Sequence, residues 1–409
     1  MRIRKRKRGL RSQVPGPTSG IVLFLFAAGA VAQTPTPAAL PPVLAEIDRQ
    51  IREGFFDPKF NGADWPGAVA KAAAELSRSP APSAEEQSTI YDNLLAVLKD
   101  SHTFRLPAGR LPERDWGTAG VRIGRDGDGY AVKGVIPGSS ADKEGLRMGD
   151  RVLAVNGRPY GKARVNFRDL FFAFEGTPKS TIDVTWQRPG EPARTSKLLL
   201  EYEEPGDRLV WDSARVIRRD LKTYGYAHVW GMSAETALAV VDMLLDREEV
   251  ARARPNLAGW GQLDGFVLDV RGNSGGYDPN ILPTFLRGQW SSGDYYLVSR
   301  DGKRVSPPAY KPLPVALLVN SGTASAGEAL ALKFRAHKIG PIVGEETAGM
   351  ASGGAGAHLL PDGSLLWFTA RTVEGLDGRR YEGQGVVPDV PAAGAEDAIL
   401  DRAIRSLSR

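Results

Sequence analysis

From about Leu209 to the end of the chain, apolar strand-like runs alternate with longer runs of helical character. Such alternation is typical of an α/β domain with largely parallel strands, because two parallel strands need a crossover, which is usually a helix. The sequence therefore predicts an α/β core over residues 204–409. The expected strands are 226–230, 266–269, 315–319, 342–343 and 365–370, and the expected helices are 234–246 and 325–337.

In such folds, ligands collect where strands end and helices begin. Ser325 follows the apolar run 314–320 at a predicted strand-to-helix junction, and Ser325-x-x-Glu328 fits a capping box. Free N–H groups and the helix dipole at that place favour a developing negative charge, so the N–H of Ala326 could serve an oxyanion. Ser325 is thus a candidate nucleophile, although an ordinary N-cap has the same pattern.

A glycine-rich turn, Arg271-Gly272-Asn273-Ser274-Gly275-Gly276, follows the strand that ends at Asp269. Glycines let the backbone approach a ligand closely, and an N–H of Gly272 or Gly275 could point at the same oxyanion. The alternative is a tight βα turn without a chemical role.

Two further regions precede this core. Residues 33–115 read as small helices, one of them behind a Ser83-x-x-Glu86 capping box, and predict a helical N-terminal domain. Residues 116–203 are short β-rich stretches broken by Gly, Pro and Asp.

The first 32 residues predict a signal peptide. They carry seven basic residues and no acidic one, and the apolar run 21–32 ends in Ala30-Val31-Ala32. The run is too short to cross a bilayer, so we expect cleavage after Ala32 and export to the periplasm or the medium, with an uncleaved anchor as the alternative. Without this segment, 46 basic residues face 48 acidic ones, which argues against a nucleic-acid partner.

The chain has no cysteine, which excludes thiol catalysis and cysteine metal sites. Its four histidines, His102, His228, His337 and His358, include no i, i+4 pair, and no Gly-Lys-Ser/Thr loop is present. We therefore expect no metal and no nucleotide cofactor.

Three blocks in residues 116–203 resemble a PDZ domain. They are Gly120-Val121-Arg122-Ile123, residues 135–141 and residues 145–157. The resemblance implies a small β-barrel that binds a peptide C-terminus as an added strand, with backbone N–H groups of Gly120, Val121, Arg122 and Ile123 near the carboxylate. A spacer with a blocked groove is the alternative.

The whole chain resembles the tail-specific (carboxy-terminal processing) serine proteases and their relatives, the tricorn core proteases. The matching segments, in family order, are residues 55–62, 100–103, the PDZ-like region, 269–276, 320–328, 343–349 and 382–389. The resemblance implies a crotonase-like ββα core with an inserted PDZ domain, and a serine endopeptidase that acts on unstructured or C-terminal polypeptide segments.

Carried over residue by residue, the resemblance makes Ser325 the nucleophile and Gly272, Gly275 and Ala326 the oxyanion candidates. Tail-specific proteases use a Ser-Lys dyad, but Met350 stands at the position of their lysine, and a thioether cannot accept the serine proton. The tricorn branch implies His102 as the base instead, oriented by Ser101 and Glu382.

Two rival interpretations stay open at this point. His228 and Ser274 faintly resemble the motifs of trypsin-like proteases that carry PDZ domains, although their order relative to the PDZ-like region argues against it. A non-catalytic peptide- or ligand-binding protein on the same fold is the second; the presence of Ser101, His102, Ser325 and Glu382 together argues against that interpretation.

Overall fold

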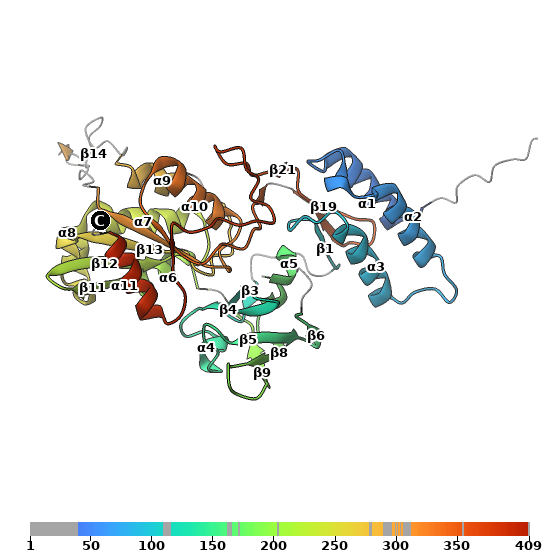
Figure 1. Ribbon diagram of the computed structural model, residues 1–409, viewed down its shortest axis with the longest axis horizontal. Coiled ribbons are helices and arrows are strands. Elements are labelled where there is room, and N and C mark those ends of the chain that lie inside the picture. Colours follow the sequence, from blue (N-terminus) through green and yellow to red (C-terminus); the bar gives the residue numbers. More distant parts are fainter. Residues whose placement is uncertain are drawn as a thin grey trace, which may run out of the picture. The chain divides into compact units, whose positions relative to one another are not determined.

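The computed structural model (Figure 1) describes residues 40–108, 116–161, 166–170, 172–202, 204–277, 280–288, 297–298, 300, 302, 304–305, 312–353 and 356–407. The predicted signal peptide, residues 1–32, lies outside the described residues.

A six-stranded sheet forms the core domain, in the order β11-β12-β13-β16-β17-β22. All neighbours pair in parallel except β11, which runs antiparallel to β12. The predicted α/β domain is therefore confirmed. The strands are β11 (Arg215–Arg219), β12 (Lys222–His228), β13 (Gly265–Asp269), β16 (Val315–Val319), β17 (Ile342–Gly344) and β22 (Val390–Pro391).

Helices cover both faces of this sheet, because its central strands bury side chains on both sides. Phe266 and Leu268 of β13 pack with α7, α9 and α10, whereas Val267 packs with α11 on the other face. The helices are α6 (Gly206–Ser213), α7 (Ala234–Leu245), α8 (Arg247–Ala253), α9 (Ile281–Leu286), α10 (Ala326–His337) and α11 (Glu396–Ser406). Short pieces complete the domain: η3 (Pro255–Leu257), η4 (Trp260–Gln262), and the pairs β14 (Leu297–Val298) with β15 (Arg304–Val305) and β18 (Ser352–Gly353) with β21 (Arg371–Thr372).

The PDZ-like region forms an antiparallel sheet in the order β3-β4-β5-β8-β9, with β6 paired to β5. No pairing among the described residues joins β3 to β9, so the expected closed barrel is not confirmed. The elements are β2 (Gly117–Thr118), β3 (Val121–Asp126), β4 (Gly129–Val135), α4 (Ser140–Lys143), β5 (Arg151–Val155), β6 (Arg158–Pro159), α5 (Phe167–Leu170), η2 (Phe172–Phe174), β7 (Glu175–Gly176), β8 (Thr181–Gln187), β9 (Arg194–Leu199) and β10 (Glu201–Tyr202).

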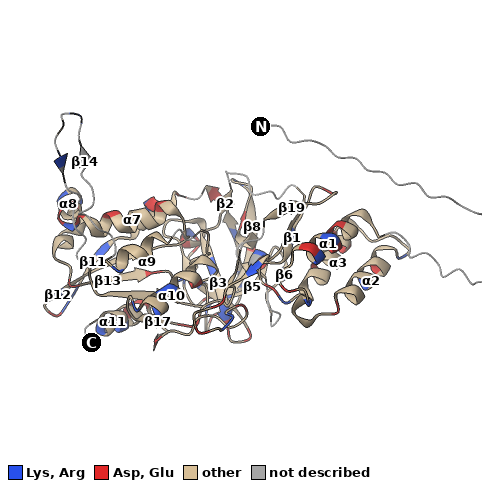
Figure 2. Ribbon diagram, turned by 90° about the horizontal axis from the view of Figure 1, so that it is seen from above, with Lys and Arg blue, Asp and Glu red and all other residues tan. Residues whose placement is uncertain are grey.

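The N-terminal domain is built from α1 (Pro42–Gly54), η1 (Phe60–Gly62), α2 (Trp65–Leu76) and α3 (Ala84–Ala96). The predicted capping box of α3 is present: the Ser83 N–H donates to Glu86 Oε2 (2.7 Å) and the Glu86 N–H donates to Ser83 Oγ (3.2 Å). Figure 2 shows acidic and basic segments side by side on α1, where Arg49 pairs with Glu46 and Glu53.

One strand expected in the core sheet lies elsewhere. β20 (Leu365–Trp367) pairs with β1 (Phe104–Leu106) and β19 (Ala357–Leu359). Leu366 and Phe368 are buried among the apolar side chains of α1, α2 and α3, so this late segment completes the N-terminal domain. Strand periodicity shows that a segment is extended but not which sheet it joins, and burial against these helices decides the matter here. No helix of the described residues is long and apolar enough to cross a membrane.

Candidate active site

Ser325 lies on a sharp turn between strand β16 and helix α10. Its backbone has φ 52° and ψ −118°, a conformation that is strained for a residue with a side chain. The predicted strand-to-helix junction is thus confirmed, but the backbone is not that of an ordinary N-cap, which lies in the extended region. Strain of this kind is typical of a serine presented as a nucleophile.

Glu328, in the first turn of α10, has a buried side-chain carboxylate that contacts the Ser325 turn. It accepts hydrogen bonds from the Ser325 N–H (3.2 Å), the Gly349 N–H (2.9 Å), the Met350 N–H (2.8 Å) and the Thr347 hydroxyl (2.5 Å). Burial raises the pKa of Glu328 to about 7, against the effect of these donors. The carboxylate therefore ties the Ser325 turn to the loop 347–350.

Ser101, His102 and Glu382 lie together, although Glu382 is 281 residues away from Ser101 in the chain. The Ser101 hydroxyl donates to Glu382 Oε2 (2.9 Å) and lies 2.9 Å from His102 Nδ1, while the Ser101 N–H donates to Glu382 Oε1 (2.9 Å). Because the single hydroxyl proton of Ser101 goes to Glu382, His102 Nδ1 must be the donor to Ser101 Oγ. This tautomer leaves Nε2 without a proton, as a general base requires.

The loop that carries Glu382 is joined to the Ser325 turn through residues 347–350. The Gly383 N–H donates to the Gly349 carbonyl (2.7 Å), and the Ser325 N–H donates to the Met350 carbonyl (3.1 Å). Three segments far apart in the sequence are thereby held in one hydrogen-bonded assembly.

His102 is 8% exposed, and this burial lowers its pKa to about 4, while the charge of Asp100 acts in the opposite direction. Asp100 and Ser352 are contacts of this group to which the motifs assigned no role. Asp100 accepts from the His102 N–H (3.0 Å), and the Ser352 hydroxyl lies within hydrogen-bond distance of both Asp100 and Glu382. Asp100 adjoins the Ser-His motif, but the sequence around Ser352 carries no signal that could have found it.

The glycine-rich turn lies against Ser325 at Gly275. A Cβ built on Gly275 would be 2.5 Å from Ser325 Cβ, so only glycine permits this approach. The Gly275 N–H donates to Asn273 Oδ1 (2.9 Å), and the Gly272 N–H donates to Asn320 Oδ1 (3.0 Å). Gly275 therefore lies next to Ser325, whereas the N–H of Gly272 is engaged with Asn320.

A buried ion pair supports the start of this turn. Arg271 NH2 contacts Asp269 Oδ2 at 2.5 Å, and both side chains are almost fully buried. Burial pushes the pKa of Asp269 up, but the charge and hydrogen bonds of Arg271 outweigh it, and the pKa falls to about 2.

The PDZ-like region contacts the same loops. The Asn320 side chain donates to the Lys133 carbonyl of β4 (2.8 Å), and the Ser321 hydroxyl donates to the Arg125 carbonyl of β3 (2.8 Å). Lys133 Nζ also pairs with Glu345 Oε2 (2.9 Å). Met350 is 4% exposed and packs, with Ala324, in the apolar cluster of the PDZ-like region.

The expected peptide-binding residues Gly120, Val121, Arg122 and Ile123 lie at the start of β3, which is an edge strand among the described residues. Val121 pairs with Val135 on its inner side. The other edge of β3 is the place where an added strand would pair.

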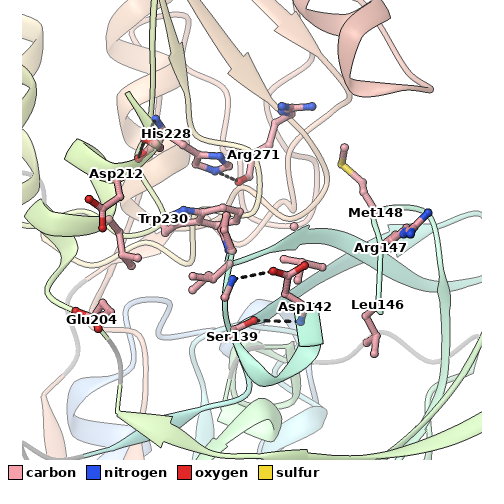
Figure 3. A pocket seen from close by; sticks show the side chains of 18 of the residues that line it. Ser139, Asp142, Leu146, Arg147, Met148, Glu204, Asp212, His228, Trp230 and Arg271 are labelled. Atoms are coloured by element: carbon pink, nitrogen blue, oxygen red, sulfur yellow. Dashed lines mark hydrogen bonds between the residues drawn. The ribbon is translucent and has the colours of Figure 1, made fainter. Parts of the chain in front are cut away.

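A cavity of about 1030 Å³ lies between the PDZ-like region and the core, lined by Trp230, His228 and Asp142 among others (Figure 3). His228 stacks on Trp230, with ring centroids 3.6 Å apart, and its Nε2 lies 2.8 Å from the Arg271 carbonyl. His228 is thus engaged in packing and backbone contacts. Ser325, His102 and Glu382 are not among the residues that line this cavity.

Comparison with known families defines the class of this protein. Residues 223–392 match Peptidase family S41, and residues 132–188 match a PDZ domain. The chain thus contains a segment similar to serine-type peptidases of this family, together with a PDZ domain.

Curated proteins that are similar to the chain include named peptidases. The chain is 28% identical over 372 residues to the chloroplastic C-terminal processing peptidase of Tetradesmus obliquus, covering 84% of this chain and 75% of the relative. It is 28% identical over 405 residues to tricorn protease homolog 1 of Streptomyces coelicolor, covering 92% of this chain and 36% of the relative. The chain spans only about a third of the length of two Streptomyces coelicolor tricorn protease homologs, 31% and 36%.

Among solved structures, the photosystem II D1 C-terminal processing protease has a TM-score of 0.56 and 24% sequence identity, covering 87% of this chain and 95% of that chain. At this identity the similarity shows a shared fold.

Proposed function

We propose that the chain is an exported serine endopeptidase that cleaves polypeptides through an acyl-enzyme on Ser325, with His102 as the general base. The observation that carries the proposal is the strained Ser325 turn, tied by hydrogen bonds to the loop of Glu382, which in turn binds Ser101 of the Ser101–His102 pair. The family match favours this function over a non-catalytic binding protein.

The proposed reaction has two halves. Ser325 Oγ attacks the peptide carbonyl carbon while its proton passes to His102 Nε2, and the C–N bond breaks as the same proton goes to the leaving amine. Water then attacks the ester carbonyl carbon while giving a proton to His102 Nε2. The bond between that carbon and Ser325 Oγ breaks as His102 returns the proton to Ser325 Oγ, which releases the acid and restores the serine. Ser101 and Glu382 orient the imidazole and stabilise its charged form.

The oxyanion of each tetrahedral intermediate would be bound by backbone N–H groups. Ala326, at the start of α10, and Gly275 of the glycine-rich turn flank Ser325 on two sides. The N–H of Gly275 donates to Asn273 Oδ1, so Gly275 can bind the oxyanion only if this N–H rotates away from Asn273 or is shared between Asn273 and the oxyanion. Gly272 would act indirectly, by anchoring the turn to Asn320.

We further propose that the edge of β3 that is not paired to β4 captures an unstructured or C-terminal substrate segment at its start, with residues 120–123 near the terminal carboxylate. We also propose that the core has a crotonase-like fold and that the signal peptide is cleaved after Ala32.

The test is labelling of the full chain with a fluorophosphonate, with the adduct located by mass spectrometry. An adduct on Ser325 that is absent from His102→Ala, in a variant that still unfolds cooperatively, supports the proposal. An adduct on Ser274, or none at all in the presence of peptides with free C-termini, overturns it.

A further inference from the structure

Two carboxylates, the buried Asp100 and the partly buried Glu382, lie beside the Ser101–His102 pair. Glu382 binds Ser101 as described above, and Asp100, 7% exposed, precedes the pair in the chain. The backbone N–H of His102 donates to Asp100 Oδ1 (3.0 Å). Asp100 therefore holds the backbone of the residue proposed as the base.

Neutral donors surround Asp100 and fix its carboxylate. The hydroxyls of Thr103 (2.8 Å) and Thr369 (2.6 Å) donate to Oδ1, and the Ser352 hydroxyl lies 2.9 Å from Oδ2. With the His102 N–H, four donors point at one carboxylate. These contacts hold the carboxylate of Asp100 in a fixed place beside His102.

The hydroxyl of Ser352 joins the two carboxylates. It lies 2.9 Å from Asp100 Oδ2 and 3.0 Å from Glu382 Oε2, but it has a single proton to share between them. Asp100 and Glu382 are therefore one electrostatic unit, bridged through Ser352.

This unit faces the group that gains charge in the proposed reaction. When His102 takes the proton of Ser325, a buried imidazolium forms, and a fixed negative charge nearby stabilises it more than it would in water. The charge of Asp100 indeed opposes the effect of burial on the pKa of His102. Of the other titratable groups, Glu382 reaches His102 through Ser101, and Glu328 of α10 faces Glu382.

We propose that Asp100 is a positioning residue of the base: it holds His102 through the backbone and stabilises the imidazolium, with Ser352 linking it to Glu382. The proposal rests on the proposed function of Ser325 and His102, and it extends the site from one carboxylate to two.

The first experiment compares rates of fluorophosphonate labelling from pH 3.5 to 8 for the full chain and for Asp100→Asn. The variant keeps the size of the side chain but removes its charge, so labelling at neutral pH should fall roughly tenfold or more, and the acidic limb of the profile should move to lower pH. A folded Asp100→Asn protein whose limb stays in place or moves to higher pH overturns the proposal.

Asp150→Asn is the matched control. Asp150 is also buried and is paired with Arg188 in the PDZ-like region, so the same substitution there also removes a buried charge. It should leave the acidic limb where it is. An equal shift in both variants would mean that the effect is not specific to His102 and would contradict the proposal.

A second measurement does not need activity. Titration of the histidine ring resonances by NMR, with His102 assigned from a His102→Gln variant, should give a lower pKa for His102 in Asp100→Asn than in the unaltered chain. If the unaltered chain is not labelled on Ser325, the proposed function fails, and this titration still decides the role of Asp100: an unchanged pKa overturns it.

If Asp100→Asn does not fold, Ser352→Ala provides the test. It leaves both carboxylates in place and removes the hydroxyl that links them, so Asp100 and Glu382 are no longer held together beside His102. Labelling at neutral pH should fall, and an unchanged labelling rate in the folded variant overturns the proposal.

Discussion

Gly275→Ala should disable the nucleophile without unfolding the protein. The new Cβ would lie 2.5 Å from Ser325 Cβ and 3.0 Å from Ser325 Oγ. Carbon atoms in contact prefer about 3.5 Å or more, so Ser325 or the glycine-rich turn must shift by about 1 Å. Because a displacement of that size in a catalytic group costs on the order of 100-fold, the rate of fluorophosphonate labelling should fall by about that factor.

Gly190→Ala is the control for backbone strain. Gly190 has φ 83° and Gly275 has φ 89°, so alanine is similarly strained at both, by roughly 1–2 kcal/mol. A Cβ on Gly190 meets nothing within 4 Å. We expect urea denaturation to show comparable losses of stability and labelling assays to show a loss for Gly275→Ala alone. Labelling of Gly275→Ala within twofold of the unaltered chain would refute the reasoning.

Three further predictions concern stability. Burial lowers the pKa of His102 from 6.5 in the unfolded chain to about 4 in the folded one, so between these pH values only the unfolded chain binds a proton. The contribution of His102 to stability is therefore full above pH 6.5 and falls by up to roughly 3 kcal/mol towards pH 4. Urea denaturation at pH 7 and pH 4 should show a smaller loss of stability for His102→Asn than for the unaltered chain. Asp269→Asn leaves the buried Arg271 unpaired and should lower the free energy of unfolding by about 3–5 kcal/mol, and the double variant Asp269→Asn/Arg271→Met should recover much of this loss. If Asp269→Asn is as stable as the unaltered chain, the pair is not buried in solution. Asn320→Ala loses the hydrogen bonds to Gly272 and Lys133 and should lower the free energy of unfolding by roughly 2–3 kcal/mol. Ser321→Ala, which loses one bond to Arg125, should lower it by less than about 1 kcal/mol, and similar losses in the two variants would contradict the bridging role of Asn320.

Local sequence predicted the parts of the fold that depend on neighbours in the chain. The apolar run before Ser325 and the capping boxes at Ser83 and Ser325 located a strand and two helix starts to within a residue or two. The φ of 52° at Ser325 was beyond such reasoning, because it follows from how α10 and the loop 347–350 pack around the turn.

Contacts between distant segments were predicted only by the family resemblance. Ser101 and Glu382 are 281 residues apart, and no spacing rule connects them. The contact of Ser352 with Asp100, and the placement of β20 beside β1, depend on tertiary packing for which the sequence has no short signal. The same limit applies to Gly272 and Gly275, which the motif could not distinguish.

The packing of Met350 limits which side chains this position can accept. In this chain, the side chain at the position of the tail-specific lysine is buried beside Ala324 within the apolar cluster of the PDZ domain. A lysine at this position would have to bring its ammonium group out of apolar surroundings to reach Ser325, and burying that charge would be costly. Replacing Met350 by lysine would therefore disturb the contact between this loop and the PDZ domain as well as adding a basic group. The choice of side chain at position 350 is thus coupled to the way in which the PDZ domain is anchored.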